Sequence, residues 1–360
     1  MMTERRAAMD VKNIILKECE ILRRYVDRRE IPGACFSIVT PKEIAYSSYG
    51  RKSLVPKETD LSSDVLYDIA SLSKVVSTST MIAKLIEEGS LSFDTKVSEL
   101  LPDFRYDDVT VLDLIVHTSG YPADDKDYKK CQDKKELLDF IYRLPRTYKK
   151  GEKVEYSCFN YILLGRIIEK LKGDMEAYAK EVLFDAIGNE RIMYKAAEKG
   201  RKEDCAPTEV TEARGVIQGE VHDGKAHIMG GVSGNAGVFA DIEALSYFAQ
   251  MMLNEGRLHG DQILSRETMK LFKESYTEGL NESRTMGGWY FGDRNTSAGT
   301  KVSDCCLYHT GFAGTSICID FSRNCAIVLL TNAIHPNRQS NIALIRKNFH
   351  EQILEYIDRM

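Results

Sequence analysis

Strand-like segments lie at both ends of the sequence, with a helical region between them, and this order limits the folds open to the chain. Residues 71–199 are mostly helical in pattern. Strands that enclose a helical middle imply one antiparallel sheet into which a mainly α-helical lobe is inserted. The strand-like runs are residues 34–40 and 43–49, joined by a proline-containing turn, and residues 289–291, 305–309, 315–320 and 326–331.

Amphipathic helices are predicted at the two ends of the chain, over residues 10–29 and 342–357. We therefore expect an α+β fold, an α/β sandwich in which an antiparallel β-sheet is flanked by these terminal helices. With 360 residues the chain can bury the core of one large domain. The expected parts of this single domain, residues 1–360, are a sheet lobe at about residues 10–65 and 285–360 and a mainly helical lobe at about residues 66–284.

Ser71 and Lys74 stand three residues apart at the predicted start of a helix, which ends at Gly89. Because residues three apart share a helix face, the amine can reach the hydroxyl. We expect burial, the positive helix N-terminus and a neighbouring cation to lower the pKa of Lys74 so that it acts as a base. A serine is also a good helix N-cap, so this motif alone leaves a structural alternative open.

Charge and cysteine content restrict the partners and the compartment. A net charge of −5 without a long basic patch argues against nucleic acid and against an anionic membrane. The N-terminal residues contain no apolar signal segment, so we expect a cytoplasmic location unless a leader has been removed. The nine cysteines form no Cys-x-x-Cys pair, which favours reduced thiols. The oligomeric state is left open.

Two further short motifs accompany the serine and the lysine. Residues 156–158 read Tyr-Ser-Cys before a predicted helix, and residues 309–311 read His-Thr-Gly at the end of a predicted strand. With these motifs the chain resembles the serine β-lactamase and penicillin-binding protein superfamily, in its class C-like branch with esterases and D-amino-acid peptidases. The segments 67–74, 114–120 and 161–165 also resemble the sequences that flank these motifs in the family.

The resemblance implies a role for each motif residue. Ser71 would be the nucleophile and Lys74 its base or base partner. Tyr156 would carry the proton between Ser71, the leaving group and the deacylating water, helped by the nearby cations Lys74 and His309. His309 would replace the lysine that β-lactamases usually carry in the third motif. The backbone N–H groups of Ser71 and Phe312 would form the oxyanion hole.

The second motif departs from the family pattern. Many relatives have asparagine where this chain has Cys158, and a thiol cannot make the two hydrogen bonds of an amide. Cys158, Thr310 and Gly311 are the candidate substrate-binding residues. With His309, this departure argues against efficient β-lactamase activity but leaves acyl transfer possible.

We therefore expect a serine hydrolase that acts through an acyl-enzyme on a small ester or amide, without metal or organic cofactor. A β-lactamase or a D-Ala-type peptidase is the alternative within the enzymes, and a catalytically silent ligand-binding relative is the alternative of another class. An α/β-hydrolase is disfavoured, because the sequence has no Gly-x-Ser-x-Gly elbow.

Other candidate motifs are interpreted as structural. His117 ends a predicted helix without a carboxylate partner in sight. His222, Asp223 and His227 lack a further close ligand and the His-Glu-x-x-His pattern, so no metal site is expected. The glycine-rich run 230–237 lacks the lysine of a phosphate-binding loop, and its composition fits tight backbone packing beside the site.

Overall fold

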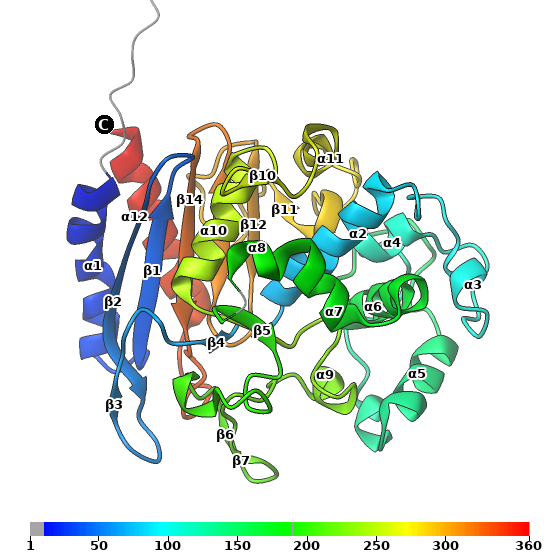
Figure 1. Ribbon diagram of the computed structural model, residues 1–360, viewed down its shortest axis with the longest axis horizontal. Coiled ribbons are helices and arrows are strands. Elements are labelled where there is room, and N and C mark those ends of the chain that lie inside the picture. The colour runs from blue at the N-terminus through cyan, green and yellow to red at the C-terminus, as the bar shows by residue number, and fades with distance from the viewer. Residues whose placement is uncertain (1–10, 189, 360) are drawn as a thin grey trace, which may run out of the picture.

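A seven-stranded antiparallel sheet joins the two ends of the chain in the computed structural model, which describes residues 11–188 and 190–359 (Figure 1). Strand β1 pairs with β2 on one side and with β14 on the other. The predicted α+β fold with one antiparallel sheet is confirmed. In the order of the sheet, the strands are β11 (Tyr290–Phe291), β12 (Cys306–Thr310), β13 (Ser316–Asp320), β14 (Cys325–Thr331), β1 (Gly33–Val39), β2 (Ile44–Ser53) and β3 (Thr59–Asp60).

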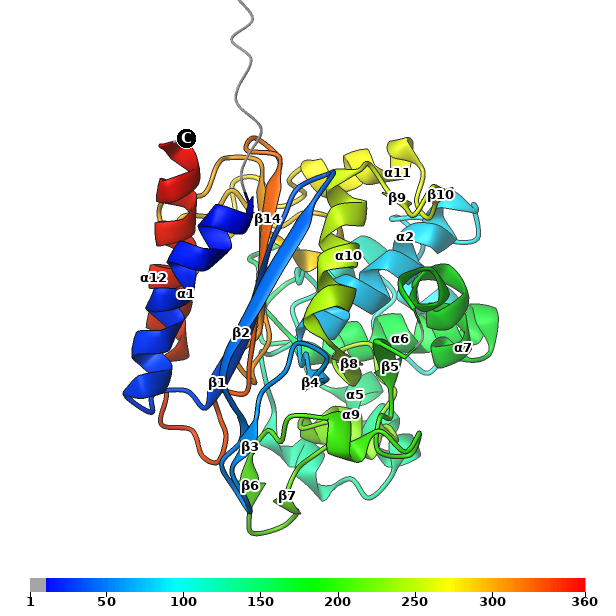
Figure 2. The same cartoon turned by 60° about the vertical axis from the view of Figure 1, so that its left-hand side comes forward.

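Helices α1 (Val11–Asp27) and α12 (Ile342–Asp358) cover one face of this sheet (Figure 2). Both terminal helices were predicted, although residue 10, the expected start of the first, lies outside the described residues. On this face Phe36 of β1 packs edge-to-face on Phe349 of α12, with ring centroids 5.4 Å apart. Burial of these apolar faces ties the ends of the chain to the sheet.

The other face of the sheet packs against α10 (Ile242–Leu253) and the helical lobe (Figure 2). Residues alternate in direction along a strand, so Val39 of β1 faces this side and belongs to the same buried cluster as Leu163 and Phe248. The hydroxyl of Ser246 in α10 donates to that of Ser37 in β1 at 2.7 Å. This continuous core between sheet and lobe supports the proposal of a single domain.

The lobe between β3 and β11 contains most of the helices, as predicted for residues 71–199. The π-helical turn η1 (Lys74–Thr78) leads directly into α2 (Ser79–Glu87). The remaining helices are α3 (Val97–Leu100), α4 (Val111–Ile115), α5 (Lys134–Arg143), α6 (Cys158–Lys172), α7 (Met175–Ala179), α8 (Asp185–Ile187), α9 (Gly224–Ile228) and α11 (Arg266–Lys270), with shorter turns η2 (Lys126–Lys130), η3 (Lys180–Phe184), η4 (Lys202–Asp204), η5 (Leu271–Lys273) and η6 (Met286–Gly288).

Sequence patterns missed the short strands of this lobe. The strands β4 (Tyr67–Asp68), β8 (Val238–Ala240) and β5 (Ile192–Tyr194) form a three-stranded antiparallel sheet. Its strand β4 leads into the turn that contains Ser71. Segments of two or three residues are too short for an alternating pattern to appear. Two hairpins of equally short strands are β6 (Val210–Thr211) with β7 (Gly215–Val216) and β9 (Arg257–Leu258) with β10 (Asp261–Gln262).

Across residues 11–188 and 190–359, every helix is too short or too polar to cross a lipid bilayer.

Candidate active site

The backbone before Ser71 is held in an unusual conformation. Strand β4 ends at Asp68, and the N–H of Ile69 donates to the carbonyl of Val238 at 3.1 Å. Ala70 then adopts a left-handed φ of +49°, and its N–H donates to the carboxylate of Asp68 at 2.8 Å. A non-glycine residue in this region costs about 1–3 kcal/mol and persists only where its surroundings enforce it. The strand and the carboxylate therefore fix the point at which the Ser71 turn begins.

Lys74 reaches Ser71 as the spacing predicted. Its side chain is fully buried, and its Nζ donates to the Ser71 Oγ at 3.0 Å and to the carbonyl of Asn235 at 2.8 Å. The first turn is closed by the bond from the Lys74 N–H to the Ser71 carbonyl at 3.1 Å. Two oxygens thus hold the ammonium in place against the serine.

Tyr156 joins this pair from the loop before α6. The Lys74 Nζ lies 5.1 Å from the centre of its ring, and Lys74 and Ser71 both favour its ionised form. On the other side the ring packs on His117, 4.7 Å away between centroids. The Nδ1 of His117 accepts the N–H of Ser157 at 3.2 Å, so this histidine fixes the loop that carries the tyrosine.

The expected lowering of the Lys74 pKa is wrong. Burial favours the neutral amine, but the ionised forms of Cys158 and Tyr156 and the carboxylate of Asp223 outweigh it and raise the pKa of Lys74 above its ordinary value. Burial also raises the pKa of Tyr156, although the Lys74 ammonium opposes this. At neutral pH the pair is therefore an ammonium beside a protonated phenol, and it must lose one proton before it contains a base.

His309 is a neutral residue and not the cation that the sequence suggested. Its side chain is buried at the end of β12, and its Nδ1–H donates to the carbonyl of Thr310 at 3.0 Å. Burial, together with the positive charges of Arg284 and Lys74, holds the pKa of His309 well below its usual range. The ring centroid lies 6.0 Å from that of Tyr156, with Nε2 left as an acceptor.

Arg284 is another buried cation beside Tyr156, and the sequence analysis missed it. Its side chain is fully buried, donates to the carbonyl of Gly288 at 2.8 Å and pairs with Glu282. Its guanidinium lies 3.5 Å from the ring centre of Tyr290 and 5.9 Å from that of Tyr156. An arginine in a polar loop has no sequence signal that distinguishes it from an exposed one, so only the packing reveals it.

The turn after β12 lies against the backbone that precedes Ser71. A methyl group on Gly311 would be 2.3 Å from the carbonyl oxygen of Ile69, so only glycine permits this approach. The N–H of Gly311 bonds to the carbonyl of Thr315 at 2.8 Å. Over the described parts of the chain, the N–H groups of Ser71 and Phe312 donate to no protein acceptor. Both therefore remain available to an oxygen atom of a ligand.

A stack of side chains holds the ring of Phe312, which is 53 % exposed. The ring lies parallel to that of His222 at 5.6 Å, and the guanidinium of Arg338 lies 4.9 Å from its centre. Glu209 accepts from His222 at 2.7 Å and from Arg338 at 2.9 Å. His222 therefore borders the Phe312 turn.

Asp223 serves the fold around α9, the helix that contains His227. The carboxylate of Asp223 accepts the N–H of Ala226 at 2.8 Å as a helix cap and the amide of Asn235 at 3.0 Å. Among residues 11–188 and 190–359, histidine, cysteine and carboxylate side chains form no group of three that could hold a metal ion.

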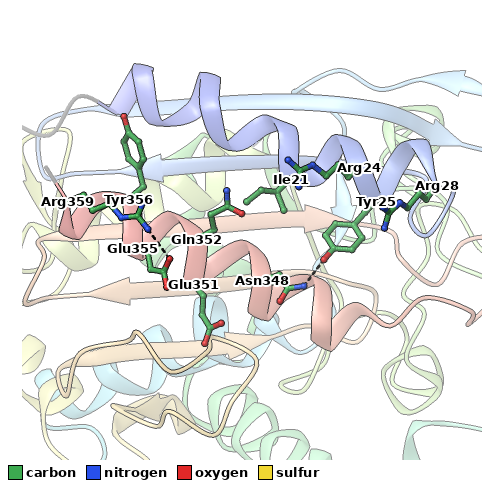
Figure 3. Close-up of a pocket in the computed structure, with 10 residues that line it drawn as sticks. All are labelled: Ile21, Arg24, Tyr25, Arg28, Asn348, Glu351, Gln352, Glu355, Tyr356 and Arg359. Atoms are coloured by element: carbon green, nitrogen blue, oxygen red, sulfur yellow. Dashed lines mark hydrogen bonds and ion pairs between the residues drawn. The ribbon is translucent and has the colours of Figure 1, made fainter.

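The remaining predicted residues flank the cluster. Cys158 is the first residue of α6, and its charge would act on both Lys74 and Tyr156. Thr310 is half-buried and lines a cavity of about 300 Å³ with Tyr290 and Glu282. A cavity of about 550 Å³ between α1 and α12, where Tyr25 accepts from Asn348, lies on the opposite face of the sheet and belongs to no part of this cluster (Figure 3).

The fold and the motif residues define the class of serine hydrolases of the β-lactamase type. The chain belongs to the β-lactamase family, because the sequence model of that family matches residues 20–348. A putative D-alanyl-D-alanine carboxypeptidase from Escherichia coli O157:H7 is 32 % identical over 346 residues, covering 84 % of this chain and 79 % of the relative.

Solved structures share the fold. A class C β-lactamase mutant superposes with a TM-score of 0.77 at 18 % identity, covering 98 % of this chain and 99 % of the other. The hydrolase EstCE1, described as having promiscuous acyltransferase activity, superposes with a TM-score of 0.74 at 18 % identity, covering 94 % and 98 %. The predicted membership of the β-lactamase and penicillin-binding protein superfamily is confirmed.

The charge state of the cluster predicts the pH dependence of acylation. Lys74 and Tyr156 both hold their protons at neutral pH, so kcat/KM for a small neutral ester should rise with pH by up to about tenfold per pH unit through neutrality and into the alkaline range. A pH-stat assay measures this without depending on the colour of the product. Activity that is already independent of pH at neutrality would instead assign the base to His309, whose pKa lies well below its usual range.

Proposed function

We propose that this protein is a serine hydrolase that forms an acyl-enzyme through Ser71 on a small ester or amide. The observation that carries the proposal is the contact of 3.0 Å between the Nζ of the buried Lys74 and the Ser71 Oγ, with the ring centre of Tyr156 5.1 Å from the same Nζ. The capping of a helix by a serine does not require a buried ammonium that donates a hydrogen bond to the serine hydroxyl.

In the proposed acylation, the Lys74 and Tyr156 pair first loses one proton to solvent. The Ser71 Oγ then bonds to the carbonyl carbon while its proton passes to the pair, with Tyr156 as the group in contact. The carbonyl oxygen becomes an oxyanion and accepts hydrogen bonds from the backbone N–H groups of Ser71 and Phe312. The bond to the leaving group breaks, and the leaving group takes the proton back from the pair.

In the proposed deacylation, a water molecule repeats these steps in place of Ser71. The pair takes a proton from the water as its oxygen bonds to the acyl carbon, and the proton returns to the Ser71 Oγ as the acyl bond breaks. The fixed positive charge of Lys74 stabilises negative charge on Tyr156 at each stage. Of the groups that take part in these transfers, the Lys74 Nζ and the Ser71 Oγ are already hydrogen-bonded in the free protein.

Two features favour a simple ester or amide over a β-lactam as substrate. Cys158 offers a weak donor where an amide would make two hydrogen bonds, and His309 offers a neutral ring where a lysine would offer a charge. The name of the E. coli relative, a putative D-alanyl-D-alanine carboxypeptidase, supports a D-Ala-type peptidase as the second candidate.

Covalent labelling tests the proposed function. We expect intact-protein mass spectrometry to show one adduct per chain with a fluorophosphonate and little or none with penicillin, because acyl transfer needs only the nucleophile, the base and the oxyanion donors. Ser71→Ala should abolish the fluorophosphonate adduct. Ser77→Ala is the matched control, since Ser77 lies in the same helical segment and bonds to Tyr194 instead.

Each outcome separates the candidates. Labelling by both reagents would favour the penicillin-recognising peptidase, and labelling by neither would identify a silent ligand-binding relative. A fluorophosphonate adduct that survives in Ser71→Ala would place the nucleophile elsewhere and contradict the proposal.

Cys158 should set the preference between amides and esters. We expect Cys158→Asn to raise the ratio of kcat/KM for acylation by penicillin to kcat/KM for a small ester by a few-fold, which corresponds to one regained hydrogen bond of about 0.5–1.5 kcal/mol. The ratio cancels changes in active fraction. Cys131→Asn, at a thiol whose charged neighbours are Glu136 and Asp133, should leave the ratio unchanged. An unchanged ratio in Cys158→Asn would show that this position does not select the substrate.

A further inference from the structure

Lys225 is a buried cation that the proposed chemistry does not use. It is the second residue of α9, which lies beside α5 (Figures 1 and 2). Its side chain is only 7 % exposed, and its Nζ donates to the carboxylate of Asp124 at 2.9 Å. The Nζ also lies 4.2 Å from the ring centre of Tyr128. Burial opposes the charge, but Asp223, Cys158 and Asp124 outweigh it and raise the pKa of Lys225.

A short chain of contacts connects Lys225 with the Ser71 cluster. The carbonyl of Asn235 accepts from Lys74, and the side chain of Asn235 donates to Asp223, the residue that caps α9 just before Lys225. The Lys225 Nζ lies 5.5 Å from the ring centre of Phe159, the residue after Cys158. Cys158 interacts electrostatically with both lysines. Lys225 therefore stands on the Cys158 side of the nucleophile.

The present partner of this cation is one that a ligand can replace. An ammonium has three hydrogens to donate, and in the described part of the chain Asp124 is the only hydrogen-bond acceptor of Lys225. The Asp124 side chain is 53 % exposed, so its carboxylate can turn to water when another anion arrives. The nearby carboxylate of Asp223 is already engaged by Asn235 and by the N–H of Ala226.

We propose that Lys225 binds a carboxylate in the acyl group of the substrate, which makes the substrate an ester or amide of an acid that carries a second, free carboxylate. The proposal rests on the proposed function and names the substrate class for the same site. A buried ammonium recognises a carboxylate through a charge-assisted hydrogen bond, which is stronger than a neutral one. This contact supplies the polar recognition that the thiol of Cys158 cannot give.

Matched esters test the proposal. Mono-p-nitrophenyl esters of succinic, glutaric and adipic acid carry a free carboxylate. Each is compared with the neutral p-nitrophenyl ester of the monocarboxylic acid that has the same number of carbons. The leaving group is the same in all of these esters, and the acyl group takes part in both acylation and deacylation. For at least one chain length we expect the wild type to prefer the anionic ester. Lys225→Met should lower the anionic-to-neutral ratio of kcat/KM by about tenfold or more, whereas Lys225→Arg should retain most of it.

Asp124→Asn separates recognition from a structural role. It breaks the same ion pair as Lys225→Met but leaves the cation free, so we expect the anionic-to-neutral ratio to rise. If Lys225 only held its loop in place, both variants would change the two esters alike, and the proposal would fail. Lys195→Met, which removes a charge that pairs with Glu176, controls for long-range attraction and should leave the ratio unchanged. If the wild type hydrolysed neither ester, the proposed function itself would be overturned.

Discussion

The buried ammonium of Lys74 connects every part of the candidate site. Its Nζ donates to the Ser71 Oγ and to the carbonyl of Asn235, and it lies 5.1 Å from the ring centre of Tyr156. A buried charge is costly unless it is paired and hydrogen-bonded, so the surrounding elements must keep these oxygens in place. The loop of Asn235, the turn of Ser71 and the loop of Tyr156 are therefore all anchored to one nitrogen atom.

The fold brings these distant segments together through short antiparallel pairings. Strand β8 pairs with β4, which places the residues before Val238 next to the turn that presents Ser71. Strand β12 belongs to the large sheet, and Gly311, the residue after it, packs on the carbonyl of Ile69. Because β1 pairs with β14, the N-terminal and C-terminal segments of the chain form one sheet beneath the site.

Local features of the site could be predicted from the sequence, whereas its electrostatics could not. The contact of Lys74 with Ser71 follows from helical spacing, and the helix after Cys158 follows from its apolar pattern. The charge states of Lys74 and His309 depend on burial and on charged groups outside their own motifs, so a local pattern gave the wrong expectation for both. Arg284 and Lys225 were missed because a buried cation and an exposed one have the same sequence signal.

Peptide mapping of enzyme quenched in acid during turnover of p-nitrophenyl acetate examines the acyl-enzyme itself. We predict that p-nitrophenol appears in an initial burst equal to the enzyme concentration if deacylation is slow, and that the acetyl group is found on Ser71 in the quenched protein. The same mapping reports on Cys158, the nucleophilic side chain of the second motif. An acetyl group on Cys158, or turnover in which no acetylated peptide forms under any quench condition, would contradict the central role of Ser71.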